Sequence, residues 1–226
     1  MDTNTRVTRH FVVPHAVLST ASHELRGPLG VARGHLRLLA QDEGVAPGVA
    51  KAVGDASRAL DRMTGLLDEL SRYAQWARGE SVLAPARASL REVLTQAAAR
   101  AVSAAGAGGA LTAEVRSSAD VVAEVDLPRL AEACASLVVA VARAHTGVPA
   151  VSLAVSGTSR GAALRIEPLP MGRRRLESRP PDLGRGGMGL AVPFADLVIR
   201  AHRGVLTEQW SAETWYGYRV RLPGPV

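Results

Sequence analysis

Apolar residues recur every three or four positions along two long segments near the start of the chain. In the first segment, predicted to be a helix over about 15–40, this stripe comprises Leu25, Leu29, Ala32, Leu36 and Leu39. In the second, predicted to be a helix over about 49–76, the stripe comprises Ala56, Leu60, Met63, Leu67, Leu70 and Ala74. Steps that alternate between three and four place each stripe on one helix face, as in a coiled-coil seam.

The segment between the two stripes is short and rich in turn-forming residues. It reads Asp-Glu-Gly-Val-Ala-Pro-Gly over 42–48, which predicts an antiparallel helical hairpin. A single hairpin cannot bury both seams well, whereas two hairpins packed as a four-helix bundle can. We therefore predict a homodimer.

The hydrophobic pattern changes after a predicted linker over 76–85. Helices are predicted over 89–105, from a capping Asp126 to about 145, and over 188–201. Strands are predicted over 110–115, 121–125, 150–155, 162–167, 205–209 and 216–222, and a mobile Arg-, Pro- and Gly-rich loop over 171–187. The predicted class is α + α/β, with a helical domain over 1–78 and an α/β domain over 79–226.

Composition and charge limit the expected cellular compartment and the expected partners. The chain has one cysteine, Cys134, so no internal disulfide is available and a reducing compartment is expected. No segment approaches the roughly 20 apolar residues that span a bilayer, and the N-terminus lacks a signal-peptide pattern, so we expect a cytoplasmic protein without a membrane partner. The net charge is +6, but the arginines are scattered and aromatics make up only 4%. Nucleic acid is therefore not expected as a partner, and an acidic protein partner fits the charge equally well.

The octapeptide Ser22-His23-Glu24-Leu25-Arg26-Gly27-Pro28-Leu29 is the most informative motif. It resembles the phosphoacceptor box of sensor histidine kinases, Ser-His-Glu-Leu-Arg-Thr-Pro-Leu, at seven of eight positions. The element order resembles the same family over about residues 11–223. The resemblance implies a dimeric four-helix bundle, a histidine-kinase-type ATPase-like α/β sandwich domain after it, and phosphorylation of His23.

The chemistry of the residues supports the same histidine. An imidazole is near neutral at cellular pH and offers a nucleophilic nitrogen, and the adjacent Glu24 can orient the ring and accept its proton. His23 lies about 200° around the helix from Leu25, so we expect it to point into solvent. The alternative is a surface histidine without a role, which the eight-residue match disfavours.

Small residues share the helix face of His23: Ala16, Ser19, Gly27, Gly30 and Gly34. Each mid-helix glycine costs about 1 kcal/mol relative to alanine. Either a partner backbone approaches closely along this strip, or the glycines stand there by chance in a chain with 22 of them. The two interpretations weigh about evenly. The predicted partner contacts are Ser19, Arg26, Gly27, Gly30 and Gly34.

The second half departs from the family at the positions that bind ATP. The resemblance implies a helix reading Asn-Leu-Leu-x-Asn-Ala that helps hold Mg²⁺, but Ser136 and Ala140 replace the two asparagines. Alanine offers no oxygen to a hard cation. The aspartate that reads adenine falls on Pro168, with Glu167 as a candidate displaced acid, and the phenylalanine motif of the lid is missing.

Three further glycines bear on activity. The stretch 184–190 partly resembles the last glycine box of the family, and Gly187 and Gly189 are interpreted as vestigial nucleotide-binding positions. A glycine-rich turn of this kind either binds phosphate through its backbone amides or only packs against the rest of the domain. The packing interpretation is favoured. Gly27 stands where the family's phosphatase activity needs Thr or Asn.

These features favour a histidine phosphotransferase that relays phosphoryl groups between response-regulator receiver domains through His23, without using ATP. The resemblance implies that the receivers supply Mg²⁺, so no resident cofactor or metal is expected. A hybrid histidine kinase is a further candidate partner. The alternatives left open are an ATP-dependent histidine kinase with a divergent nucleotide pocket, and a non-catalytic adaptor that binds kinase or receiver domains.

Overall fold

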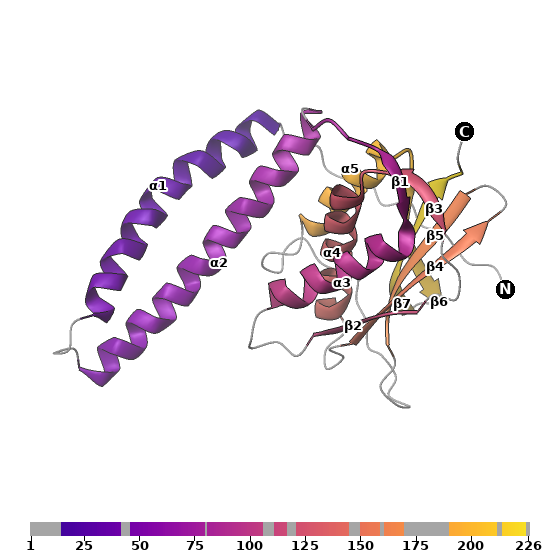
Figure 1. Cartoon of the computed structure of the whole chain (residues 1–226). Coiled ribbons are helices and arrows are strands. Elements are labelled where there is room, and N and C mark those ends of the chain that lie inside the picture. Colours follow the sequence, from indigo (N-terminus) through magenta and orange to yellow (C-terminus); the bar gives the residue numbers. More distant parts are fainter. Residues whose placement is uncertain are drawn as a thin grey trace. The chain divides into compact units, whose positions relative to one another are not determined.

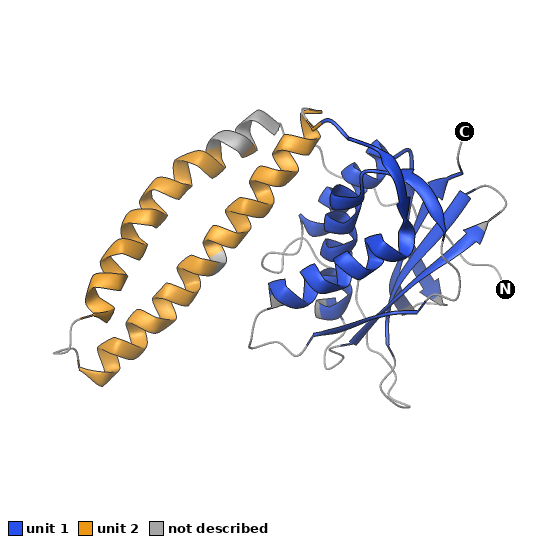
Figure 2. Ribbon diagram, viewed as in Figure 1, with its two compact units in different colours: residues 1–10, 82–226 blue, residues 11–81 orange. Residues whose placement is uncertain are grey.

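Two compact units make up the chain: a helical unit that ends at Ser81 and an α/β unit that begins at Val82 (Figure 2). They are seen here in a computed structural model. It describes residues 15–41, 46–79, 81–105, 111–116, 121–144, 150–158, 161–169, 190–211 and 214–224. None of the helices in these ranges is both long enough and apolar enough to cross a membrane.

The helical unit is a hairpin of two long antiparallel helices, α1 (His15–Ala40) and α2 (Pro47–Ala77) (Figure 1). Proline at the first turn of α2 is compatible with helix initiation, because its missing N–H would have had no partner there. Gly79, with a φ of 70°, follows the end of α2 in the left-handed region that terminates helices. The predicted hairpin is confirmed, with bounds that differ by at most two residues from those expected.

Two ion pairs join the helices of the hairpin in one register. Arg26 Nη2 lies 2.8 Å from Asp68 Oδ1, and Arg33 Nη2 lies 3.3 Å from Asp61 Oδ1. The two arginines are one heptad apart on α1, and the two aspartates are one heptad apart on α2. Each pair is partly exposed and contributes about 0.2–1 kcal/mol, so the pairs select the register more than they stabilise the hairpin.

The α/β unit contains one main sheet, one small sheet and three helices. Its elements are β1 (Ala86–Ser89), α3 (Leu90–Ala105), β2 (Thr112–Val115), β3 (Val122–Val125), α4 (Leu127–Ala144), β4 (Ala150–Thr158), β5 (Gly161–Pro168), α5 (Ala191–Ala201), β6 (Val205–Ser211) and β7 (Thr214–Pro223). The main sheet has the order β2-β4-β5-β7-β6, in which β2 and β4 are parallel and the other neighbours antiparallel. The small sheet pairs β1 with β3.

Helices α3, α4 and α5 cover one face of the main sheet (Figure 1). The core between these layers contains alternate strand residues such as Leu153, Leu164 and Val220, all fully buried. Trp215 and Tyr218 add the largest side chains and pack edge to face, with ring centroids 5.2 Å apart. Burial raises the pKa of the Cys134 thiol to about 12, so this cysteine is a neutral core residue.

Asp126 and His202 connect three parts of the α/β unit. Asp126 Oδ1 accepts a hydrogen bond from the Arg129 amide at 3.1 Å, which confirms the predicted helix cap, and Oδ2 accepts one from the Ala84 amide at 3.0 Å. The Asp126 amide donates to His202 Nε2 at 3.0 Å, and His202 Nδ1 lies 2.8 Å from the Val198 carbonyl oxygen. Because Nε2 accepts the amide hydrogen, Nδ1 is the ring nitrogen that donates to the Val198 carbonyl.

Some predicted boundaries were wrong. Strand β1 was not predicted: it fills residues 86–88, between the expected linker and helix, and includes Ser89, the expected first residue of that helix. Ser89 instead caps α3, since its Oγ accepts a hydrogen bond from the Glu92 amide at 3.2 Å. Helix α5 begins at Ala191 rather than 188. The loop predicted over 171–187 lies outside the described residues.

Candidate functional site

Residues of the phosphoacceptor-like motif lie on different faces of α1. Ser22 is fully buried and its Oγ donates to the Leu18 carbonyl at 2.8 Å, whereas His23 and Glu24 are exposed. The prediction that His23 points into solvent is therefore confirmed. Among the described residues, neither His23 nor Glu24 has a hydrogen bond or ion pair, so the expected contact between them is not formed in this conformation. The role of Glu24 stays a prediction.

A proline lies inside α1, five positions after His23. Pro28 has no N–H, so the Glu24 carbonyl lacks the donor that an ordinary residue would supply at this point of the helix. The helix nevertheless continues to Ala40. The Glu24 carbonyl, next to His23, therefore accepts no hydrogen bond from the residue four positions later in the helix.

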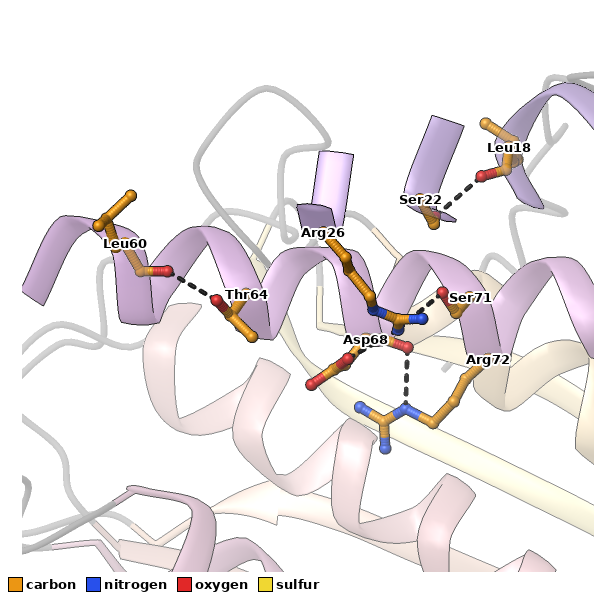
Figure 3. Close-up of polar contacts among 8 residues, drawn as sticks. All are labelled: Leu18, Ser22, Arg26, Leu60, Thr64, Asp68, Ser71 and Arg72. Carbon is orange, nitrogen blue, oxygen red and sulfur yellow. Dashed lines mark hydrogen bonds and ion pairs between the residues drawn. The ribbon is translucent and has the colours of Figure 1, made fainter. Parts of the chain in front are cut away.

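Arg26 is anchored on the second helix of the hairpin. Figure 3 shows its side chain pointing from α1 toward Asp68 and Ser71 on α2. Its Nη2 donates to Asp68 Oδ1 at 2.8 Å and to Ser71 Oγ at 3.0 Å. Arg72 Nε donates to the backbone oxygen of Asp68 at 3.4 Å. Arg26, predicted as a partner contact, thus has a role within the hairpin, and 38% of its side chain stays accessible.

Asp68 and Ser71 were not identified from the sequence as part of this site. The available signal was the repeat of opposite charges one heptad apart, Arg26 and Arg33 on one helix and Asp61 and Asp68 on the other. That repeat becomes informative only once the antiparallel register of the two helices is known.

The glycines of the predicted strip border open space. A Cβ built on Gly27, Gly30 or Gly34 would have no heavy atom within 4 Å, and all three residues are exposed. No contact inside the described hairpin therefore requires glycine at these positions. Ser19 lies in α1, but its side chain is outside the described residues.

Ser136, Ala140 and Pro168 of the α/β unit occupy the positions where the resemblance led us to expect ATP contacts. Ser136 is half-buried in α4 and its hydroxyl donates to the Glu132 carbonyl at 3.2 Å, and Ala140 is fully buried. Pro168 is buried at the end of β5. Because strand side chains alternate, Glu167 lies on the opposite sheet face from Pro168. Gly187 and Gly189 lie outside the described residues.

The helical hairpin matches a known domain family. Residues 15–79 match the His Kinase A (phospho-acceptor) domain. The match contains His23 and both helices of the hairpin. The hairpin therefore resembles a phospho-acceptor domain of the His Kinase A type.

Solved structures show the same fold over nearly the whole chain. Full-length ShkA, solved in complex with AMPPNP, aligns with a TM-score of 0.69 and 17% identity over 93% of this chain and 46% of its own. The Acinetobacter baumannii histidine kinase AdeS aligns with a TM-score of 0.58 and 16% identity over 90% of this chain and 98% of its own. At such identities the likeness concerns the fold, and it confirms the α + α/β class. The chain spans just under half the length of ShkA. Comparison with curated protein sequences gives no match.

Proposed function

We propose that the protein is a histidine phosphotransferase of a two-component system, which relays phosphoryl groups between response-regulator receiver domains through His23. The observation that carries this proposal is the exposed imidazole of His23 on α1, inside the segment that matches the phosphoacceptor domain. An exposed imidazole on a folded helix is accessible to a protein-borne phosphoryl group.

The transfer step needs only a nitrogen nucleophile and a receiver. A ring nitrogen of His23 attacks the phosphorus of a receiver aspartyl phosphate, and the N–P bond forms as the P–O bond to the carboxyl group breaks. The carboxylate leaves with the bonding electrons. Glu24 accepts or orients the proton on the other ring nitrogen. The reverse step passes the phosphoryl group to a second receiver, and Mg²⁺ is supplied by the receivers.

Transfer without ATP is supported by the α/β unit. The three positions at which the family places Mg²⁺ and adenine contacts carry Ser136, Ala140 and Pro168. Ala140 has no side-chain oxygen for Mg²⁺, and Pro168 has no acid group for adenine. The competing function is an ATP-dependent histidine kinase with a divergent pocket, which the AMPPNP complex of ShkA favours. A non-catalytic adaptor that keeps His23 only by descent is the third candidate.

The proposed working form is a cytoplasmic homodimer. Leu25, Leu39 and Met63 of the predicted seams remain 46–48% exposed within one chain, and a second hairpin would cover them. The receiver docks beside His23 on the exposed strip with Gly27, Gly30 and Gly34, and a hybrid histidine kinase is a further candidate partner.

The decisive experiment offers the protein a panel of phosphorylated receiver domains and follows the label. We expect acid-labile, base-stable labelling of the wild type, as nitrogen-bound phosphate gives. His23→Gln abolishes the label, while His35→Gln, an exposed histidine on the same helix, retains it. Labelling from Mg·ATP alone would establish the kinase instead. If no receiver labels the wild type and His23→Gln still supports signalling in cells, the adaptor is correct.

A further inference from the structure

The main sheet has one face that no described helix covers. Along β5, the fully buried residues Leu164 and Ile166 alternate with Ala163, Arg165 and Glu167, which lie on the other face. Helices α3, α4 and α5 pack on the face with the fully buried residues (Figure 1). The other face is open to solvent at Arg165 and at Arg221 of β7, both exposed.

Three arginines gather at the centre of this open face. Arg165 of β5 lies directly opposite Arg219 of β7, and Arg221 follows two residues along β7 on the same face. Like charges placed directly opposite each other destabilise a pair of strands. None of the three guanidinium groups forms an ion pair or hydrogen bond with a described residue. The half-buried Arg219 also has its Nε enclosed without a hydrogen-bond acceptor. We call Arg165, Arg219 and Arg221 the arginine face.

Two alanines and one carboxylate surround the arginine face. Ala154 lies opposite Arg165 on β4, and Ala163 lies opposite Arg221 on β5, so small side chains flank the arginines. Glu167, two residues from Arg165 along β5, is the nearest carboxylate on this face by register, and it forms no described ion pair with the arginines. The concentrated positive charge is therefore not neutralised within the described part of the unit.

The spacing suits an extended acidic peptide. Arg219 and Arg221 repeat every second residue, about 6.6 Å apart at 3.3 Å per residue. An extended segment with acidic residues at alternate positions repeats its carboxylates at the same interval. Guanidinium groups bind carboxylates through paired hydrogen bonds. Each arginine can therefore meet one carboxylate without distortion of the peptide.

Other polyanions fit this face less well. None of its described residues is aromatic, so single-stranded nucleic acid finds no stacking platform. Lipid surfaces are bound by clusters of about four to eight basic residues or by apolar side chains that insert. Val205, 51% exposed beside Arg221, is the one large exposed aliphatic residue on the described part of the face.

We propose that the arginine face binds an extended acidic segment of a partner protein, with carboxylates at alternate positions. The site lies wholly within the α/β unit and does not use His23. It is therefore independent of the proposed phosphotransfer function and can be tested separately.

The test uses the full chain and a fluorescent peptide of alternating glutamate and serine, measured by anisotropy in low-salt buffer. Arg165→Gln together with Arg221→Gln removes the two exposed cations and should weaken binding by about tenfold, since exposed ion pairs contribute a few-fold each. The control is Arg87→Gln together with Arg91→Gln, which changes the net charge equally at exposed positions away from the face. The control should bind within about twofold of the wild type, and circular dichroism verifies the fold of both variants.

Two comparisons make the test specific. A peptide with the same glutamates in one block should bind more weakly than the alternating peptide, because its carboxylates do not match the two-residue repeat. Duplex DNA and vesicles with anionic lipid are offered in parallel. Absence of peptide binding, equal loss in the control variant, or tighter binding of DNA or vesicles than of the peptide would each overturn the proposal.

Discussion

Replacing Leu25 by aspartate is the sharpest test of the proposed dimer. Leu25 belongs to the predicted seam of α1, yet 48% of it is exposed within one chain. Leu67, in the seam of α2, is only 6% exposed and so is already packed within the chain. Leu25→Asp should therefore act on association, whereas Leu67→Asp should act on the folding of the chain itself.

The expected size of the effect follows from this exposure. Full burial of a leucine side chain stabilises by about 1.5–3 kcal/mol, so covering the exposed half of Leu25 contributes about 1 kcal/mol. A two-fold dimer contains the position twice, which gives about 2 kcal/mol. Aspartate also introduces unpaired carboxylates into the covered seam, at a cost of several kcal/mol in total. A sum above about 4 kcal/mol raises the dissociation constant by roughly 10³.

Light scattering at micromolar concentration and circular dichroism separate the two effects. We expect the wild type to have the mass of a dimer, and Leu25→Asp to have the mass of a monomer with its α/β unit folded. Val31→Asp is the matched control, because Val31 is 62% exposed on α1 but lies off the seam. It should leave the dimer intact. A monomeric wild type, or a Leu25→Asp variant that remains dimeric, would refute the bundle.

Three further predictions follow from the site and the core. Gly30→Leu has open space around it, so it should raise helix stability by up to about 1 kcal/mol yet slow phosphotransfer from a receiver, measured by unfolding and by label transfer. Glu24→Gln should slow transfer by roughly 10² without changing receiver affinity, as loss of proton transfer predicts. Because burial raises the pKa of Cys134 to about 12, iodoacetamide should label it slowly in the folded chain at pH 9 and rapidly after unfolding.

Local patterns were sufficient to predict the helices and most strands. The stripes of α1 and α2 repeat over many turns, and the same periodicity places His23 on the face away from Leu25. Asp126 was predicted as a helix cap because the capping contact, to the Arg129 amide, spans only three residues. These predictions succeeded because the interactions concerned lie close together in the sequence.

Features that depend on distant pairing could not be predicted. Strand β1 is four residues long and carries no alternating pattern, and it is recognisable only through its pairing with β3, from Ala86 opposite Val125 to Ser89 opposite Val122. The insertion of β7 between β5 and β6 likewise places Arg219 opposite Arg165 through a long-range pairing. The contact of Arg26 with Asp68 required the register between two helices, which neither helix determines alone.

One face of α1 packs within the hairpin, and the other exposes His23. The residue before the histidine is buried, and Arg26, one turn later, is held by Asp68 and Ser71. The backbone at His23 is thus fixed on the inner side of the helix, while the imidazole has no described partner that must be broken before it reacts. We infer that the nucleophile needs little local rearrangement to meet a phosphoryl donor. We propose that selection among donors depends on how closely each partner fits the exposed strip of Gly27, Gly30 and Gly34, where a Cβ would meet no atom of this chain within 4 Å.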